Sequence, residues 1–275
     1  MNEALASSEP IPKRKILMCP PRYYGIYYEI NPWMDIKKNA DNTLANKQWA
    51  DLYETLASKL SCSVSLIDPA AGLPDMCFTA NAGLLFTDTF IPSNFRHRER
   101  EGESEYFIQW FQETGYRVEK LPGEYYFEGQ GDALFHGDIL FAGYHFRSEI
   151  HTHKLIGDMI KRRVISLELV DPYFYHLDTC FCPLDEKSVL YYPEAFDSYA
   201  LKVINRFVEN PIPVEKGDAM NFGCNAIPLG KDIVLSKGCA NLCEKLSSLG
   251  FTVYEVELSE FMKAGGAAKC LAFIL

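Results

Sequence analysis

The chain has 275 residues, of which 48% are hydrophobic and 13% aromatic, so it can bury a large core. Its formal net charge of −10 argues against nucleic acid or an anionic membrane as a partner, because both require a basic surface, whereas a small cationic substrate is compatible. No stretch reaches the roughly 20 apolar residues needed to cross a bilayer, and no secretory signal is present at the start, so we expect a cytoplasmic protein.

Apolar residues recur with helical spacing in five segments, which predicts amphipathic helices there. These segments are residues 43–60, 103–114, 148–163, 197–208 and 239–249. Gly115 and Gly250 follow two of them, at the position where a left-handed glycine commonly ends a helix.

Short runs rich in β-forming residues lie between the helices. They are residues 15–18, 63–67, 83–91, 116–121, 137–143, 164–169, 175–183, 188–192, 221–228, 232–235, 251–256 and 269–275. Residues 136–137 and 229–231 are typical of turns between paired strands. One helix thus alternates with about three strands, roughly five times. This pattern is compatible with five ββαβ modules in an α/β propeller and with an open α/β sheet, and periodicity alone does not choose between them.

Nine cysteines could form disulfides or bind a metal. Their odd number and the lack of an export signal favour reduced thiols. The spacings of Cys180 from Cys182 and of Cys239 from Cys243 differ from the paired spacing of a zinc site, so we expect no metal.

An acidic, glycine-rich segment covers residues 127–133. It contains Glu128 and Asp132, and its two glycines let the backbone approach a ligand closely. A turn that only requires positive φ angles would explain the same pattern. The acidic pair directly before an apolar strand favours a functional site.

His176 and Asp178 are two residues apart in an expected strand, so their side chains would share one face. A carboxylate beside an imidazole orients the ring and raises its pKa, which suits a general acid or base. A lone histidine in a strand is commonly structural, so the sequence leaves both interpretations open.

Cys270 follows the small residues 264–268, which leave space around its sulfur. Lys269 would help to lower the pKa of the thiol if its ammonium turned inward. A buried, inert cysteine is the alternative.

Three further polar residues stand near expected turns or strand ends. Asp75 and Asn81 surround the apolar centre of residues 74–83, where each could instead cap a turn. Arg147 follows a strand end, where it could hold a carboxylate bidentately or lie in solvent.

Taken together, these motifs resemble the guanidine-modifying enzymes of the pentein fold, and most closely the catalytic domain of arginine dihydrolases. The similarity extends along the chain through residues 18–21, 31–34, 78–84, 176–182 and 265–270. It implies a five-module ββαβ propeller around a central active site. Residues 15–275 would form a single catalytic domain after a flexible extension of residues 1–14. A small guanidine substrate and no cofactor are implied, and a homo-oligomer is left open.

The resemblance also assigns roles to individual residues. It implies that Cys270 is the nucleophile, His176 the proton carrier and Glu128 a guanidinium-binding carboxylate that can also handle protons. It places Asp75, Asp178, Asn31 and Phe78 at the substrate and Arg147 at its α-carboxylate. Such enzymes usually have a second carboxylate-binding arginine near residues 94–98; Asn94 occupies that place, and Arg96 is expected to substitute.

The implied chemistry is attack of the Cys270 thiolate on the guanidinium carbon, giving an S-linked amidino intermediate that water hydrolyses. Deiminases of this superfamily have Asp where this chain has Asn81. A carboxamide both donates and accepts hydrogen bonds, so it could hold a neutral ureido group as well. Our hypothesis is that bound citrulline is attacked a second time, giving ornithine, carbon dioxide and two ammonia molecules.

Other functions remain open. A dimethylarginine hydrolase or an arginine deiminase would give citrulline, and an amidinotransferase would use the same cysteine and histidine. A pentein-fold binding protein without catalysis would not be expected to keep Glu128, His176 and Cys270 together. A cysteine protease is a more remote alternative, because the acidic residues suit a cation better than a peptide carbonyl.

Overall fold

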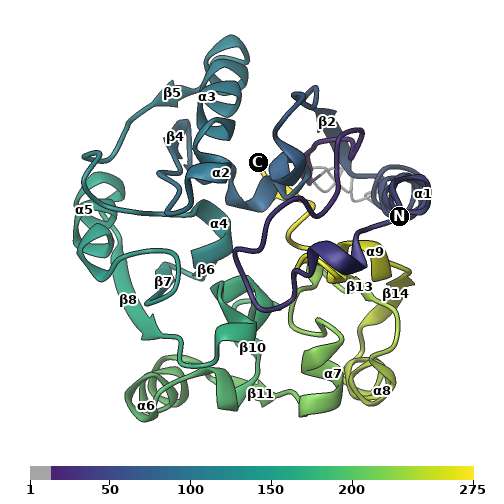
Figure 1. Ribbon diagram of the computed structural model, residues 1–275. Coiled ribbons are helices and arrows are strands. Elements are labelled where there is room, and N and C mark those ends of the chain that lie inside the picture. The colour runs from purple at the N-terminus through teal and green to yellow at the C-terminus, as the bar shows by residue number, and fades with distance from the viewer. Residues whose placement is uncertain (1–13) are drawn as a thin grey trace, which may run out of the picture.

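The computed structural model describes residues 14–275, which form five three-stranded sheets around a central axis (Figure 1). In every sheet an inner strand is antiparallel to a middle strand, and an outer strand is parallel to the middle one. The predicted α/β propeller is therefore confirmed, and an open sheet is excluded. The predicted flexible extension lies, except for Arg14, outside the described residues.

The inner, middle and outer strands of the five modules are as follows. They are β15 (Phe273–Ile274), β1 (Lys15–Met18) and β2 (Ser63–Leu66); β3 (Gly83–Phe86), β4 (Thr89–Pro92) and β5 (Arg117–Val118); β6 (Ala133–His136), β7 (Ile139–Tyr144) and β8 (Arg163–Glu168); β9 (Phe181–Pro183), β10 (Ser188–Tyr191) and β11 (Asn210–Pro213); and β12 (Ile227–Leu229), β13 (Asp232–Ser236) and β14 (Thr252–Val256).

A helix connects each middle strand to its outer strand, because parallel strands need a long crossover. These helices are α1 (Asn42–Glu54), α3 (Glu103–Glu113), α5 (Ile150–Ile160), α6 (Ser198–Phe207) and α8 (Ala240–Ser248). All five predicted helices are confirmed, and Gly115 and Gly250 have the expected positive φ angles. Shorter helices are α2 (Arg98–Glu101), α4 (Gly129–Asp132), α7 (Lys216–Met220) and α9 (Ser259–Met262).

Helix α6 shows how local sequence sets these elements. The Asp197 carboxylate accepts hydrogen bonds from the backbone N–H groups of Tyr199 and Ala200, which caps the first turn. Ala200 and Ile204, one turn apart, are fully buried and pack in the core between the helix and its sheet. The apolar face therefore fixes the side on which the helix covers the sheet.

The strand predictions were less accurate. Residues 83–91 form two strands rather than one, because Thr87 adopts a positive φ angle and reverses the chain. Residues 175–183, 221–228 and 269–275 contain strands only at their ends, since each begins with a turn. Strand β11 was missed because it contains two prolines, which an edge strand tolerates.

The last strand closes the ring. Strand β15 pairs with β1, so that Phe273 lies opposite Leu17 and the two chain ends share one sheet. The Phe273 ring is fully buried and packs edge-on against Phe90 and Phe111 of the second module. The C-terminal residues are therefore a structural part of the first module and of its junction with the second.

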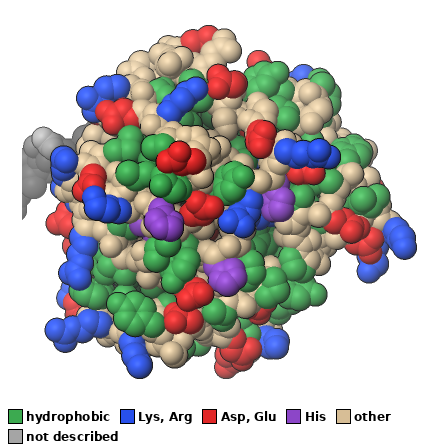
Figure 2. All heavy atoms as spheres, turned by 60° about the vertical axis from the view of Figure 1, so that its left-hand side comes forward, with side chains coloured by type: hydrophobic (Ala, Val, Ile, Leu, Met, Phe, Trp, Pro, Cys, Tyr) green, Lys and Arg blue, Asp and Glu red, His purple; other side chains and the backbone are tan. Residues whose placement is uncertain are grey.

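Two observations concern the surface and membranes. On the face shown in Figure 2, acidic, basic and apolar side chains are interspersed, and no broad basic patch is seen there. Within residues 14–275, no helix combines the length and the apolar character needed to cross a bilayer.

Replacing Phe273 by alanine is expected to lower the free energy of unfolding by about 3–5 kcal/mol, because a buried ring is lost at the ring closure. Urea unfolding followed by circular dichroism measures this change. Tyr199→Ala, at a side chain that is 68% exposed on α6, serves as the control and is expected to change stability by less than about 0.5 kcal/mol. Equal stability of the two variants would contradict the closing role of β15.

Candidate active site

The turn before each inner strand carries a predicted catalytic group or its partner. In chain order these are Asn81 before β3, Glu128 before β6, His176 and Asp178 before β9, Asn225 before β12 and Cys270 before β15. None of these residues is more than 3% exposed. The five-fold repetition of the module therefore gathers groups from distant parts of the sequence at one end of the central axis.

A small buried pocket joins most of the predicted site residues. It is lined by Asn31, Asp75, Phe78, Asn81, Arg147 and Cys270, together with Arg100 and Tyr175. The ring of His176 lies 4.8 Å from the ring of Tyr175. A Cβ atom at Gly131 would meet both the Asn81 amide and the His176 ring. The imidazole thus lies behind Tyr175 and Asn81, two residues that line the pocket with Cys270, and a glycine is required at position 131.

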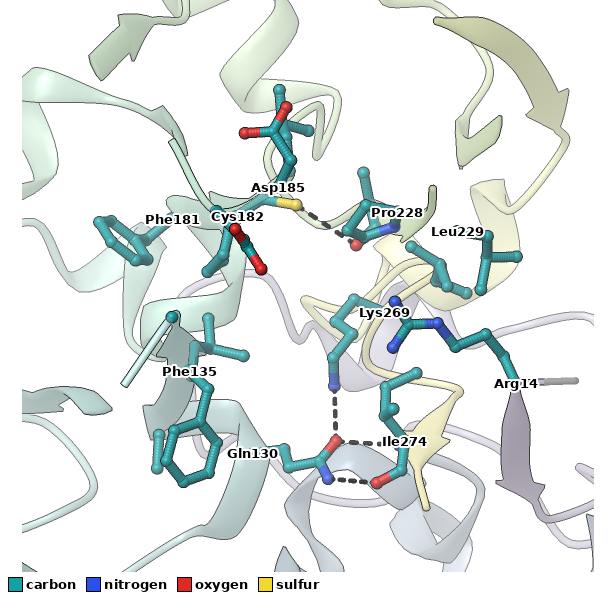
Figure 3. Close-up of a pocket in the computed structure, with 18 of the residues that line it drawn as sticks. Arg14, Gln130, Phe135, Phe181, Cys182, Asp185, Pro228, Leu229, Lys269 and Ile274 are labelled. Atoms are coloured by element: carbon teal, nitrogen blue, oxygen red, sulfur yellow. Dashed lines mark hydrogen bonds between the residues drawn. The ribbon is translucent and has the colours of Figure 1, made fainter. Parts of the chain in front are cut away.

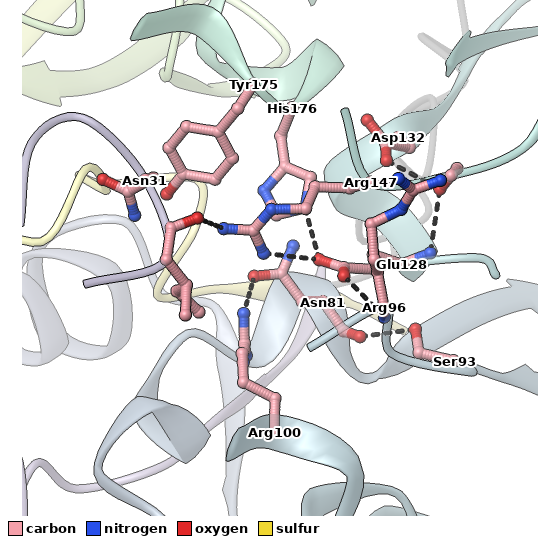
Figure 4. A network of polar contacts seen from close by, with 12 residues as sticks. Asn31, Asn81, Ser93, Arg96, Arg100, Glu128, Asp132, Arg147, Tyr175 and His176 are labelled. Carbon is pink, nitrogen blue, oxygen red and sulfur yellow. Dashed lines mark hydrogen bonds and ion pairs between the residues drawn. The ribbon is translucent and has the colours of Figure 1, made fainter. Parts of the chain in front are cut away.

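The carboxylate of Glu128 is the centre of the polar network (Figure 4). Its Oε2 accepts hydrogen bonds from His176 Nε2 at 2.7 Å and from Arg147 Nη1 at 3.1 Å. Its Oε1 accepts from the backbone N–H of Arg96 at 3.2 Å. Burial alone raises the pKa of Glu128, but Arg147 and His176 outweigh it and hold the pKa well below its usual range. Glu128 is therefore ionised and orients the imidazole.

A second carboxylate, Asp132, ties together the turns that carry Glu128 and His176. Its Oδ1 accepts the backbone N–H of Leu177 at 3.0 Å, and its Oδ2 accepts the Ser148 hydroxyl at 2.6 Å. The same hydroxyl oxygen accepts the backbone N–H of Glu128 at 3.0 Å. Burial raises the pKa of Asp132 to about 6. Its contacts make it a positioning residue.

The Cys270 thiol is held between Asp178 and Asn225. Its sulfur lies 3.5 Å from Asp178 Oδ2 and accepts a hydrogen bond from Asn225 Nδ2 at 3.1 Å. Asn225 Oδ1 accepts the backbone N–H groups of Ala267 and Cys270, each at 3.2 Å. One amide therefore fixes both the sulfur and the turn that carries it. Asn225 was not predicted as a site residue, because residues 221–228 were expected to form a strand.

The surroundings of the Cys270 sulfur differ from those of Glu128, because a carboxylate lies beside the sulfur and no cation of the described residues contacts either group. Burial and the neighbouring Asp178 raise the pKa of the Cys270 thiol well above its ordinary value. Burial also raises the pKa of Asp178 to about 6, although Lys269 opposes this. The protein alone therefore presents a neutral thiol beside a carboxylate at neutral pH. A substrate cation placed there would lower both pKa values.

Two buried polar atoms on residues lining the pocket have no partner among the described residues, namely Oδ1 of Asp75 and Nδ2 of Asn81. The other atom of each side chain is held, since Tyr28 Oη donates to Asp75 Oδ2 at 3.0 Å and Arg100 Nη1 donates to Asn81 Oδ1 at 2.9 Å. An arginine can only donate, so the amide of Asn81 is fixed with its NH₂ group unpaired. Two residues that line the pocket thus each keep one unpaired polar atom, an acceptor on Asp75 and a donor on Asn81.

Arg100 is a site residue that sequence analysis missed. It is only 3% exposed, and both oxygens of the buried Glu103 accept its N–H groups at 2.8 Å. Its guanidinium also lies over the ring of Phe95. Arg100 stands in the charged run of residues 96–101, most of which is at least partly exposed, so nothing in the pattern distinguishes it from a solvated helix start.

The predicted partnership of His176 with Asp178 is wrong. Residues Leu177–Thr179 form a 3₁₀ turn rather than a strand, so the two side chains do not share a strand face. His176 instead bonds to Glu128, and Asp178 contacts Cys270. Both residues remain in the site, with different partners.

Arg96 is not placed as expected. Its guanidinium lies 3.7 Å from Glu149 and over the ring of Tyr126, and it is not among the groups that line the pocket. Only its backbone N–H reaches the site, through Glu128. The second arginine of the pocket is Arg100.

No cluster of three or more His, Cys, Asp or Glu side chains within residues 14–275 is arranged to hold a metal ion. All nine cysteines lie in this part of the chain, and all are free thiols. Eight of them are buried, and Cys243 is partly exposed.

Because the pKa of Cys270 is raised, its alkylation by iodoacetamide is expected to keep accelerating up to pH 9 in the absence of substrate. Peptide mass spectrometry distinguishes Cys270 from the other cysteines. The Asp178→Asn variant removes the adjacent negative charge and is expected to reach half-maximal alkylation at a lower pH. A rate that is already constant between pH 6 and 8 would contradict this electrostatic account.

Comparisons with known proteins identify close relatives, although no family model matches the chain. The bifunctional arginine dihydrolase/ornithine cyclodeaminase ArgZ of Synechocystis sp. is 49% identical over 94% of this chain and 37% of its own length. The N(G),N(G)-dimethylarginine dimethylaminohydrolase of Mycobacterium tuberculosis is 40% identical over 94% of this chain and 84% of that protein. The chain therefore spans just over a third of the bifunctional relative and most of the other.

A solved structure gives the same result. The crystal structure of the N-terminal domain of ArgZ, described as an arginine dihydrolase of cyanobacteria and bound to its substrate, superposes with a TM-score of 0.92. It is 47% identical to this chain and covers 95% of it and 98% of the domain. The match in sequence, in modules and along almost the whole chain shows that this protein belongs to the guanidine-modifying pentein family, together with arginine dihydrolases and dimethylarginine dimethylaminohydrolases.

Proposed function

We propose that the chain is an arginine dihydrolase, which converts L-arginine and water into ornithine, carbon dioxide and two ammonia molecules, with residues 15–275 as one catalytic domain. The observation that carries this proposal is the buried pocket lined by the thiol of Cys270, which lies against Asp178, and by Asp75, whose Oδ1 has no partner among the described residues. These acceptors fit a planar cation with N–H donors on several sides, which is the guanidinium group.

The first round begins with the cation itself. A guanidinium beside Asp178 and Cys270 offsets the negative charge that keeps the thiol protonated, so the thiolate forms only when the substrate is bound. The sulfur attacks the guanidinium carbon, and His176 donates a proton to the departing ammonia. His176 then accepts a proton from the water that attacks the S-linked amidino carbon, which releases the sulfur and leaves citrulline. Glu128 keeps the imidazole oriented throughout.

Asn81 supports a second round on bound citrulline. Arg100 occupies its carbonyl oxygen, so the side chain offers an N–H donor to the pocket. A ureido oxygen accepts a hydrogen bond from that donor, whereas a guanidinium nitrogen cannot. The sulfur then attacks the ureido carbon, the second ammonia leaves, and water releases a carbamate that breaks down to ornithine and carbon dioxide. Arg100, itself held by Glu103, is a positioning residue for this step.

Arg147 fits the other end of the substrate. Arg147 lies over the ring of Tyr175 and donates to the backbone carbonyl of Ile30 at 2.9 Å, which fixes the plane of its guanidinium. Its cation would attract an α-carboxylate, and Asn31 and Phe78 complete the wall on which the substrate chain rests.

Hydrolysis of dimethylarginine to citrulline is the second candidate, and the 40% identity to a dimethylarginine dimethylaminohydrolase over most of its length favours it. The free donor of Asn81 favours the dihydrolase, because it gives a bound ureido product a partner that would hold it for a second attack.

The free thiols fit the reducing cytoplasm, which we propose as the location. Formation of a homo-oligomer stays a prediction.

Incubation with L-arginine and detection of ornithine, citrulline and ammonia tests the reaction. We expect two ammonia molecules per ornithine. The Cys270→Ser variant is expected to lose activity by more than about 1,000-fold, because the nucleophile is removed. Cys243→Ser, at a partly exposed cysteine outside the site, is the matched control and should remain active. Unchanged turnover in Cys270→Ser would remove the nucleophile assignment.

The Asn81→Asp variant is expected to release citrulline in place of ornithine. The carboxylate pairs with Arg100 and presents an acceptor to the pocket, so the ureido oxygen loses its donor. Product ratios from mass spectrometry measure this change. Asn205→Asp on the surface of α6 makes the same chemical change away from the site and should leave the ratio as in the natural protein. An unaltered ratio in Asn81→Asp would show that Asn81 does not control the second round.

The KM for arginine is expected to rise as the pH falls from 7 to 5. The pKa of Asp178 is raised to about 6, so the carboxylate is ionised above this pH and becomes protonated below it, where it no longer attracts the guanidinium. Steady-state kinetics at constant ionic strength measure the change. The Asp178→Asn variant should have a high KM with little dependence on pH in this range. A natural protein whose KM is flat from pH 7 to 5 would contradict the role of Asp178.

A further inference from the structure

The inner strands enclose a second cavity, of about 700 Å³ (Figure 3). Residues of β3, β6, β9, β12 and β15 all line it, and it extends to the turns that follow these strands, such as Gly137 and Gly230. The Cys270 pocket is built from the turns that precede the same strands, and the two spaces share no lining residue. We call this space the rear cavity. Its size is that of a small-molecule site.

Lys269 lines the rear cavity with an ammonium group that has no carboxylate of the described chain in contact, although Asp178 is near enough to stabilise its charge. The residue is 7% exposed, and no ion pair is formed by its side chain among residues 14–275. Its Nζ donates to Gln130 Oε1 at 3.1 Å and to the backbone carbonyl of Ala272 at 3.3 Å. An ammonium has three N–H donors, so one is left over. A buried cation whose hydrogen-bond partners are all neutral is costly: burial lowers the pKa of Lys269, and an anion in the cavity would offset that cost.

The remaining walls indicate the kind of anion. They are mostly apolar and include Leu84, Phe135 and Leu229, while the exposed cation Arg14 stands at the border. Asp185 and Glu186 also border the cavity, which disfavours a molecule with several negative charges. We propose that the rear cavity binds a small organic monoanion, with its carboxylate on Lys269 and its apolar body against Leu84, Phe135 and Leu229, and that binding there changes the reactivity of Cys270.

The coupling follows from the chain. The backbone N–H of Lys269 donates to the carbonyl of Asn225 at 3.2 Å, and the side chain of Asn225 holds the sulfur and the backbone of Cys270. The charge of Lys269 also lowers the pKa of the Cys270 thiol. An anion on Lys269 offsets that charge, so less thiolate forms at a given pH. By reciprocity, a state that favours the thiolate weakens binding of the anion.

Hexanoate is a suitable probe, with hexanamide as a neutral molecule of the same length. We expect hexanoate to bind saturably in calorimetry and to slow the alkylation of Cys270 by iodoacetamide several-fold at pH 8.5, whereas hexanamide has no effect. The Lys269→Met variant should lose hexanoate binding. In the Leu229→Trp variant, the indole fills the mouth of the cavity, away from the catalytic turns. Cys270 of this variant should be alkylated at the rate that the natural protein shows without hexanoate, and adding hexanoate should not change that rate.

Three results would overturn the proposal. The first is no saturable binding of hexanoate at millimolar concentrations. The second is an equal response to hexanamide, which would remove the role of charge. The third is an undiminished hexanoate effect in Leu229→Trp, which would place the anion elsewhere, including in the Cys270 pocket. Alkylation does not require turnover of arginine, so failure here is distinguishable from failure of the proposed hydrolase activity.

Discussion

Closure of the ring between β15 and β1 is the constraint on which the catalytic geometry depends. The pairing of Phe273 with Leu17 determines where the preceding turn lies, and the backbone carbonyl of Cys270 accepts the N–H of Ala80 at 3.1 Å as a result. Cys270 and Asn81 therefore line the same pocket, although the two residues lie in opposite halves of the sequence. Holding the two residues together costs conformational entropy. Burial of the final strand, rather than contacts within the pocket, offsets this cost.

Buried charge in the site is arranged in two groups with different balance. Around Glu128, the Arg147 guanidinium and the hydrogen bond from His176 stabilise one carboxylate, so this carboxylate is ionised and held in place before any substrate arrives. Around Cys270, one carboxylate lies next to a thiol without a cation in contact, so the charge there is completed by the substrate. This division suits catalysis. The Glu128 carboxylate already orients the imidazole before substrate binds, whereas the Cys270 thiol is activated only when the substrate is present.

Much of the architecture followed from the sequence, and the reasons for the misses are physical. Helices such as Ser198–Phe207 have a capping residue and a clear apolar face, so their positions were predictable. The turns before β9, β12 and β15 were interpreted as parts of strands, because each leads directly into a strand and the sequence does not mark where the turn ends. The His176–Asp178 partnership failed for this reason. Arg100 and Asn225 could not be found by pattern, since their roles depend on partners that only the tertiary fold supplies.

The covalent step is tested most directly by trapping the intermediate. When the natural protein is mixed with arginine and quenched within one turnover, an arginine-derived group should be found on the sulfur, because the S-linked amidino intermediate forms before water attacks it. Acid quenching followed by peptide mass spectrometry identifies the modified residue. The account predicts a mass increase confined to the peptide that contains Cys270. An adduct on a different cysteine, or turnover of arginine without any adduct, would contradict it.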